Sequence, residues 1–228
     1  MKLSSSLFLF FIFSGAISFC GQMVQAGELA WTFEENADQW EAAKGIWEVE
    51  DGVYHQKQRW GKAIHSLVGE TSWTDYTLQA KVRIYEGNWA GIVFRAQDEF
   101  QYYVYLFCPK EKVSELWLHK TGGPFARQAI DDHIEARNVE LKRQVWLNFQ
   151  VQVEGNRIAL SINGELQAEF TDDTYRRGKI GVWAWDTIAS FDEVRVFGSS
   201  VQPTSTNVDY HWKLPLTWGN LKRIYHIH

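Results

Sequence analysis

Apolar and polar side chains alternate with a period of two residues, and this feature constrains the fold of the chain more than any other. Over residues 77–85 every second side chain, from Leu78 to Ile84, is apolar, and those between are polar or charged. The pattern recurs over residues 147–153 and 158–162. Successive side chains of a β-strand point to opposite faces of a sheet, so the pattern predicts strands with one face in a core and one in water.

Turn signals separate these predicted strands. Asp51-Gly52, Gly155-Asn156 and Asn163-Gly164 supply residue types that tolerate the positive φ angles of tight hairpins. The best candidate for a helix, residues 134–145, is short and highly charged, so we expect a loop or a single helical turn there. Many short strands without helices predict an all-β fold, an antiparallel sandwich of two sheets.

The first 26 residues have the features of a secretory signal peptide. Lys2 precedes an apolar run over residues 7–19, and Val24-Gln25-Ala26 fits a cleavage site. The alternative is a membrane anchor, but the run is shorter than the roughly 20 residues that span a bilayer. We therefore expect a secreted, periplasmic or cell-surface protein with no membrane span. Residues 27–198 would form the sandwich, residues 199–207 a polar linker, and residues 208–228 a short tail.

Charge and cysteine content narrow the function classes further. The 228-residue chain has a net charge of −5 and no basic cluster, which argues against nucleic acid or an anionic membrane surface as the main partner. Of the two cysteines, only Cys108 follows the predicted cleavage site. The mature protein would therefore have no internal disulfide, and burial of apolar area must stabilise the fold.

A second class of strand mixes large aromatic and polar side chains on one face. These strands cover residues 91–95, 102–107, 115–119 and 179–185. We assign to the core their aliphatic sides, namely Ile92/Phe94, Val104/Leu106, Leu116/Leu118 and Ile180/Val182. The opposite face, which we call the aromatic platform, would hold Arg95, Tyr103, Tyr105, Trp117, His119, Trp183 and Trp185. Sugars pack their C–H faces on indole rings, so the platform predicts a glycan-binding surface. The alternative is that Trp183 and Trp185 belong to the core between the sheets.

Several segments, in order, resemble one superfamily. They are residues 45–52 (GIWEVEDG), 73–78 (WTDYTL), 90–98 (AGIVFRAQD), 178–181 (GKIG) and 191–196 (FDEVRV). The chain from about Trp31 to Phe197 resembles the concanavalin A-like/laminin-G superfamily. More narrowly, it is similar to the branches named domain of unknown function 1080 (3-keto-disaccharide hydrolase-like) and levan-binding module.

The resemblance implies a jelly roll of two antiparallel sheets that holds a glycan or polysaccharide on a concave face. Arg95, Asp98 and Tyr103 fall where the levan-binding relatives place residues that contact sugar. Some laminin-G-like relatives hold a structural calcium ion through an acidic residue on the last strand, which would be Asp192. The other calcium ligands are not recognisable in this sequence, and we expect no further cofactor.

For some candidate residues the alternative to ligand binding is a role in stabilising the fold. The Arg95 guanidinium could hold sugar hydroxyls, or it could form an ion pair with Asp98 or Asp186 that orders the sheet. His119 could contact a ligand or be an ordinary surface histidine. Trp60 and Trp89, in predicted loops, could mark a binding rim or cap the edge of the sandwich.

Catalytic motifs are absent from the sequence. No strand carries the Glu-x-Asp-x-(x)-Glu pattern of the glucanases in this superfamily, and no serine-hydrolase, zinc-protease or phosphate-loop motif occurs. We therefore predict an exported, non-catalytic glycan-binding module. Two alternatives stay open: an enzyme that acts on 3-keto-glycosides, with Asp98, His119 and Asp186 as acid/base candidates, and a laminin-G-like protein-interaction domain.

Overall fold

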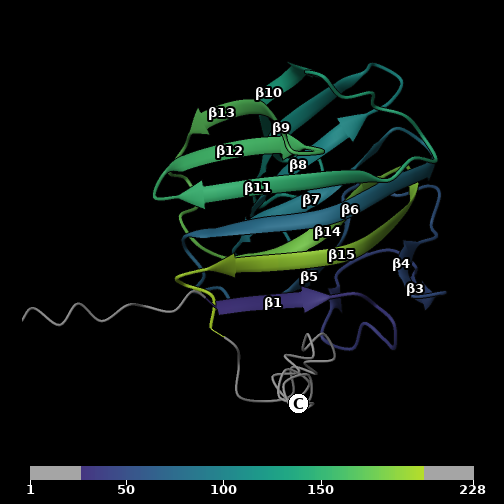
Figure 1. Ribbon diagram of the computed structural model, residues 1–228, viewed down its shortest axis with the longest axis horizontal. Coiled ribbons are helices and arrows are strands. Elements are labelled where there is room, and N and C mark those ends of the chain that lie inside the picture. Colours follow the sequence, from purple (N-terminus) through teal and green to yellow (C-terminus); the bar gives the residue numbers. More distant parts are fainter. Residues whose placement is uncertain (1–26, 203–228) are drawn as a thin grey trace, which may run out of the picture.

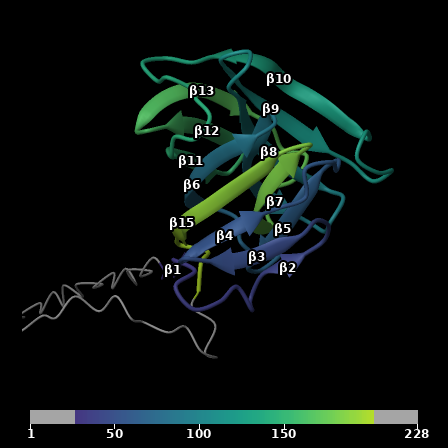
Figure 2. The same cartoon turned by 90° about the vertical axis from the view of Figure 1, so that its right-hand side faces the viewer.

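The computed structural model describes residues 27–202, which fold into two antiparallel β-sheets that face each other (Figures 1 and 2). Sheet A has the strand order β13 (Glu165–Thr171), β12 (Arg157–Ile162), β11 (Leu147–Glu154), β6 (Tyr76–Glu86), β15 (Ile188–Gly198), β4 (Val53–Gln56) and β3 (Trp47–Glu50), with β1 (Gly27–Trp31) paired to β15. Sheet B has the order β10 (Arg127–Glu135), β9 (Val113–His119), β8 (Tyr102–Cys108), β7 (Trp89–Ala96), β14 (Lys179–Trp185), β5 (Ile64–Val68) and β2 (Glu41–Ala42). The predicted all-β antiparallel sandwich is confirmed.

Residues 27–202 contain only strands and loops, so this part of the chain has no helix that could cross a membrane. Residues 134–145, the candidate helix, are not helical. The first two belong to the end of β10 and the others form a loop, as expected. The predicted signal peptide (1–26), the tail (208–228) and residues 203–207 of the linker lie outside the described residues.

The strands of sheet A follow the alternation of the sequence. In β6 the side chains from Tyr76 to Ile84 are buried at every second position and half-buried at those between. β11 alternates in the same way. The hairpin turns of sheet A lie where expected. Asn163 and Gly164, between β12 and β13, have φ angles of 52° and 83°. Both angles are positive, as the tightest hairpin turns require.

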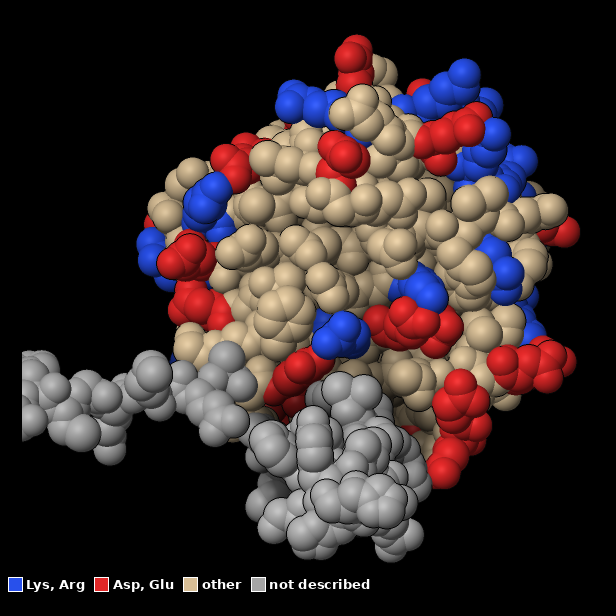
Figure 3. Space-filling model, in the orientation of Figure 1, with Lys and Arg blue, Asp and Glu red and all other residues tan. Residues whose placement is uncertain are grey.

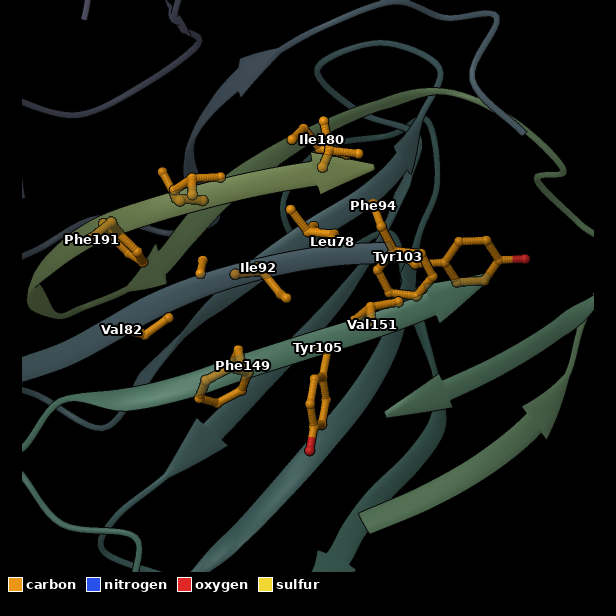
Figure 4. Close-up of a cluster of buried hydrophobic side chains, with 14 of the residues drawn as sticks. Leu78, Val82, Ile92, Phe94, Tyr103, Tyr105, Phe149, Val151, Ile180 and Phe191 are labelled. Carbon is orange, nitrogen blue, oxygen red and sulfur yellow. The ribbon is translucent and has the colours of Figure 1, made fainter. Parts of the chain in front are cut away.

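The inner faces of the two sheets form the main hydrophobic core (Figure 4). Leu78, Val82, Phe149 and Val151 come from sheet A and meet side chains from sheet B. Among these partners are Ile92, Phe94, Tyr103, Tyr105 and Ile180. Cys108 is buried and unpaired, so within residues 27–202 no disulfide supplements this core.

The placement predicted for β8 is wrong, because Tyr103 and Tyr105 face the main core instead of the platform. The Tyr103 ring stacks on Phe94 at 5.1 Å, and the Tyr105 ring lies 5.1 Å from Phe149. Their hydroxyl groups find polar partners at the edge of the core, Asp172 and Ser114. Val104 and Leu106, which we assigned to the core from the sequence, lie on the outer face instead. Both faces of β8 are buried, so polarity could not distinguish them.

A second apolar cluster covers the outer face of sheet B. It includes Val93, Val104 and Leu106 at the centre of the sheet, and Trp183 and Trp185 on β14. The central strands of sheet B, β7, β8 and β14, are therefore buried on both faces, which explains why they do not alternate cleanly in the sequence.

The outer face of sheet A is different, because its side chains, such as Gln79, Gln150 and Gln152, are polar. Charges of both signs are scattered over this face (Figure 3). Ion pairs such as Lys81–Glu193 and Arg157–Glu169 join neighbouring strands on this sheet. The described part of this face therefore offers no concentrated positive charge (Figure 3).

Candidate functional site

Trp183 and Trp185 lie on the outer face of sheet B, as predicted, but they are covered. Their rings are tilted against each other at 6.0 Å, and their exposed fractions are only 1% and 7%. The loop between β9 and β10 lies over them: Phe125 meets Trp185 edge-on at 5.3 Å. The expected open platform is therefore wrong in this respect: the loop covers Trp185, and the site on this face is a pocket.

Sheet B curves at this pocket, and the long side chains of Arg127 and Trp185 reach toward each other across its outer face. Arg127, at the start of the edge strand β10, places its guanidinium carbon 4.3 Å from the ring centre of Trp185 on β14. Three strands separate β10 from β14, and in a flat sheet these two strands would lie roughly 19 Å apart. The outer face of sheet B is therefore concave, as the sandwich resemblance implied.

The pocket encloses about 230 Å³ on this concave face. It is lined by Trp89, Leu106, Glu111, Glu115, Trp117, Arg127, Asp132, Trp183 and Trp185. We call it the tryptophan pocket. Ligand sites of drug-sized molecules have about 300–1,000 Å³, so this pocket suits a ligand near the size of one sugar ring.

Strand register brings these side chains together. Glu115 and Trp117 are two residues apart on β9 and therefore share the concave face. Glu115 pairs with Leu106, Leu106 with Gly91, and Gly91 with Trp183. These four residues therefore lie in one row across the neighbouring strands β9, β8, β7 and β14. Gly91 contributes no side chain to the floor of this row.

Arg127 forms one wall of the tryptophan pocket. Its guanidinium carbon lies 4.4 Å from the ring centre of Trp117 and 4.3 Å from that of Trp185, so the cation is held between two indoles. Burial lowers the pKa of Arg127, and Glu115 opposes that shift. An arginine keeps its charge at any physiological pH, so the pocket contains a fixed donor of several hydrogen bonds.

Glu115 is a buried carboxyl group in the same pocket, with an exposed fraction of 7%. The indole Nε1 of Trp117 donates a hydrogen bond of 2.6 Å to its carboxylate. Burial raises the pKa of Glu115, while the hydrogen bonds from Trp117 and Trp89 and the charge of Arg127 lower it in part. Among the described residues Glu115 forms no ion pair. A desolvated carboxyl of raised pKa is typical of acid/base groups.

His119 lies on the concave face, as predicted, but outside the tryptophan pocket. Its ring stacks on Tyr102 at 4.6 Å with an interplanar angle of 14°, and meets Trp183 edge-on at 5.9 Å. Of the seven platform residues, the structure thus brings four together on this face: Trp117, His119, Trp183 and Trp185.

The prediction that Arg95 faces the platform is wrong, and it forms neither of the expected ion pairs. Arg95 has a φ angle of 51° at a bulge between β7 and β14, which turns its side chain away from the concave face. The fully buried guanidinium donates to the backbone carbonyls of Thr74 (3.2 Å) and Gly155 (2.6 Å). Arg95 therefore ties loops together at one end of the sandwich.

Asp98 and Asp186 also order turns. The Asp98 carboxylate accepts hydrogen bonds from the backbone amides of Phe100 and Gln101 in an exposed turn. Asp186 accepts from the amide of Gly61 at 2.9 Å and pairs with Lys62. None of the described contacts brings either carboxylate to Glu115.

The sequence did not single out Glu115 or Arg127, two of the four charged residues that line the pocket. Glu115 could have been found by extending the Trp117/His119 alternation two residues back along the strand. Arg127 gave no signal, because β10 is an edge strand with two register shifts. Trp89 was a rim candidate and lines the pocket, whereas Trp60 is 73% exposed on a loop.

Within residues 27–202 no group of three or more histidine, cysteine or acidic side chains is arranged to hold a metal ion. Asp192 is half-buried on β15, and burial raises the pKa of its carboxyl group. The structural calcium ion at Asp192 stays a prediction.

The sequence of residues 31–197 matches the family described as the 3-keto-alpha-glucoside-1,2-lyase-like domain. The chain belongs to this family. The match covers nearly the whole sandwich of the lyase-like domain, and it agrees with the predicted resemblance.

One curated relative of this lyase-like domain is an extracellular exo-alpha-L-arabinofuranosidase of Streptomyces chartreusis, 25% identical over 152 residues. The match covers 62% of this chain and 17% of the arabinofuranosidase, so the chain spans less than a fifth of that relative.

Solved structures that share the fold of this chain include a carbohydrate-binding module and a glucanase. The carbohydrate-binding module CBM66 of Bacillus subtilis matches with a TM-score of 0.59 and 17% identity, over 69% of this chain and 94% of the module. The β-glucanase of Bacillus licheniformis matches with a TM-score of 0.52 and 11% identity, over 75% of this chain and 97% of the glucanase. At such identities the likeness concerns the fold alone.

Proposed function

We propose that the tryptophan pocket binds one sugar residue of a glycan and that this recognition is the function of the domain. The observation that carries the proposal is the stack of Trp117, Arg127 and Trp185 beside the buried Glu115. A guanidinium and a carboxyl group suit the hydroxyls of a sugar, while the indole surface that Arg127 leaves uncovered suits its apolar C–H groups. Membership of a family named for a glucoside reaction supports a carbohydrate ligand.

Trp117→Ala tests this proposal. The substitution removes one wall of the pocket and one of the two indoles that hold Arg127, so we expect affinity for a bound glycoside to fall at least tenfold. Isothermal titration with methyl α-glucoside and with its 3-keto form would measure the loss. A glycan array would make the same comparison for other glycans. The control is Trp60→Ala, which removes an exposed tryptophan outside the pocket. Equal affinities of the two variants would contradict the proposal.

The raised pKa of Glu115 favours a second function, catalysis of an elimination reaction. In a 3-keto-glucoside the ketone at C3 acidifies the hydrogen on C2. Glu115 would take that proton, and the C2–H electrons would form an enolate whose oxygen Arg127 stabilises. Collapse of the enolate would form the C1–C2 double bond and break the bond from C1 to the leaving oxygen, which then takes up the proton that Glu115 removed from C2.

Glu115→Gln separates the two functions. The amide keeps the size of the side chain but cannot take a proton, so an enzyme would lose turnover by at least a hundredfold and still bind its ligand. The conversion of methyl 3-keto-α-glucoside, followed by NMR, measures this loss. If the wild type binds the glycoside but forms no product, the domain is a binding module and the eliminating function is wrong.

We also propose that the protein is exported. The signal-peptide pattern of residues 1–26 and the extracellular arabinofuranosidase relative support this location. Mass spectrometry of the protein recovered outside the cytoplasm would test it, because cleavage after Ala26 gives a chain that starts at Gly27.

A further inference from the structure

The tryptophan pocket carries more negative than positive charge. Its charged lining residues are three acidic ones and one basic one, namely Glu111, Glu115, Asp132 and Arg127. Three carboxylates and one guanidinium give the lining a formal charge of −2. A cleft lined by an excess of one sign attracts ligands of the opposite sign and repels ligands of the same sign.

The carboxyl groups of the pocket lack a cationic partner. None of the three forms an ion pair with a described residue. Glu115 is more than nine-tenths buried, whereas Glu111 and Asp132 are exposed. The hydrogen bond that Glu115 accepts comes from the neutral indole of Trp117. The pocket therefore holds a buried carboxyl group whose charge no neighbour neutralises by direct contact.

Glu111 and Glu115 lie close enough to repel each other when both are ionised. Burial raises the pKa of Glu115, and the charge of Glu111 raises it further. Arg127 lowers that pKa by less than Glu111 raises it. The charge around Glu115 is thus negative on balance, and a cation bound in the pocket would relieve the repulsion.

The pocket also limits the size and shape of such a cation. Its volume of about 230 Å³ suits one sugar ring. Arg127 lies over the indoles of Trp117 and Trp185, while Trp89 and Trp183 have no cation over their rings in the described part of the chain. Indole rings attract cations as well as C–H groups. An amino sugar supplies both, since its ring is apolar on its C–H groups and its ammonium is a strong donor to carboxylates.

We propose that the preferred ligand of the tryptophan pocket is an amino sugar, a hexosamine residue whose free amine is protonated. Glu111, Glu115 and Asp132 select it over neutral and acidic sugars. This inference rests on the proposed sugar-binding function and names the ligand class of the same site.

Three methyl glycosides that differ in charge test the inference. Isothermal titration at pH 6 would compare methyl glucosaminide, which is positive, with methyl glucoside and with methyl glucuronide, which is negative. We expect the glucosaminide to bind about tenfold more tightly than the glucoside, because each carboxylate contributes a few-fold at partly exposed positions. The glucuronide should bind about tenfold more weakly than the glucoside. Raising the salt from about 50 mM to about 500 mM NaCl should reduce both differences, since salt screens these charges.

The double variant Glu111→Gln/Asp132→Asn tests which residues set this preference. It removes two charges and keeps the size of both side chains, so we expect the preference for the glucosaminide to fall to about threefold or less. The control is Glu70→Gln/Glu135→Gln, which changes the net charge equally at two exposed positions outside the lining and should keep the preference.

The outcomes separate this inference from the proposed function. If the wild type binds the glucoside and the glucosaminide equally, or if the double variant keeps the full preference, selection of an amino sugar by these carboxylates is wrong and sugar binding stands. If none of the three glycosides binds to the wild type, the proposed function fails and this inference fails with it.

Discussion

At the scale of single residues, the concave face is unusual because neutral and charged groups are buried there without strong partners. Glu115 keeps a carboxyl group in a desolvated pocket, and His65 and His119 each keep one buried ring nitrogen without a hydrogen-bond partner. Such groups reduce stability, since a buried polar atom loses its hydrogen bonds to water. A ligand that supplies the missing partners would recover part of that free energy on binding.

The two buried histidines predict how stability depends on pH. Their folded-state pKa values, about 4 and about 3, lie below the usual 6.5. Between these limits the unfolded chain binds more protons than the folded one, so the free energy of unfolding falls as the pH drops below about 6.5. The decrease continues down to the folded pKa values and amounts to several kcal/mol for the two histidines together.

Urea unfolding of the wild type and of His119→Phe between pH 7 and pH 4 measures this effect. Glu115 acts in the opposite direction, because its pKa is raised, so the difference between the two proteins is the useful quantity. We expect the curve of the variant to be flatter. Parallel curves would mean that His119 titrates normally in the folded protein.

At the scale of elements, β7 and β8 must lie close together beneath the site. A Cβ atom at Gly91 would overlap the carbonyl oxygen of Tyr105 and approach the Cα atom of Leu106, both on β8. These are backbone atoms, so no side-chain rotation could relieve the overlap. Only glycine therefore fits at position 91 without moving the two strands apart.

Gly91→Ala should destabilise the protein by about 2–3 kcal/mol, because β7 and β8 must move apart. Urea unfolding monitored by tryptophan fluorescence would measure the loss. Gly123→Ala is the control: nothing lies within 4 Å of the added Cβ, and only the positive φ angle of 96° opposes it. A loss no greater than that of the control would show that the strands accommodate the methyl group.

At the scale of the whole molecule, the sequence predicted the sandwich but only part of the site. Alternation defines β6 and β11 because water covers one face of sheet A. In β8 it fails, since both faces are buried. The face of Trp117 and Trp183 was predicted because aliphatic neighbours claim the core, whereas the position of Arg127 depends on the curvature of sheet B and on the loop after β9. Curvature and loop course are properties of the assembled fold and leave no local pattern in the sequence.

The pairing of β1 with β15 places the first and last strands of the sandwich side by side. Gly27 is the register partner of Gly198, so the chain enters and leaves the sandwich at one place (Figure 1). A unit with neighbouring ends can be spliced into a host polypeptide, or appended to one, without separating the flanking segments. The arabinofuranosidase relative, in which the matching region is a small fraction of a much longer chain, fits such modular reuse.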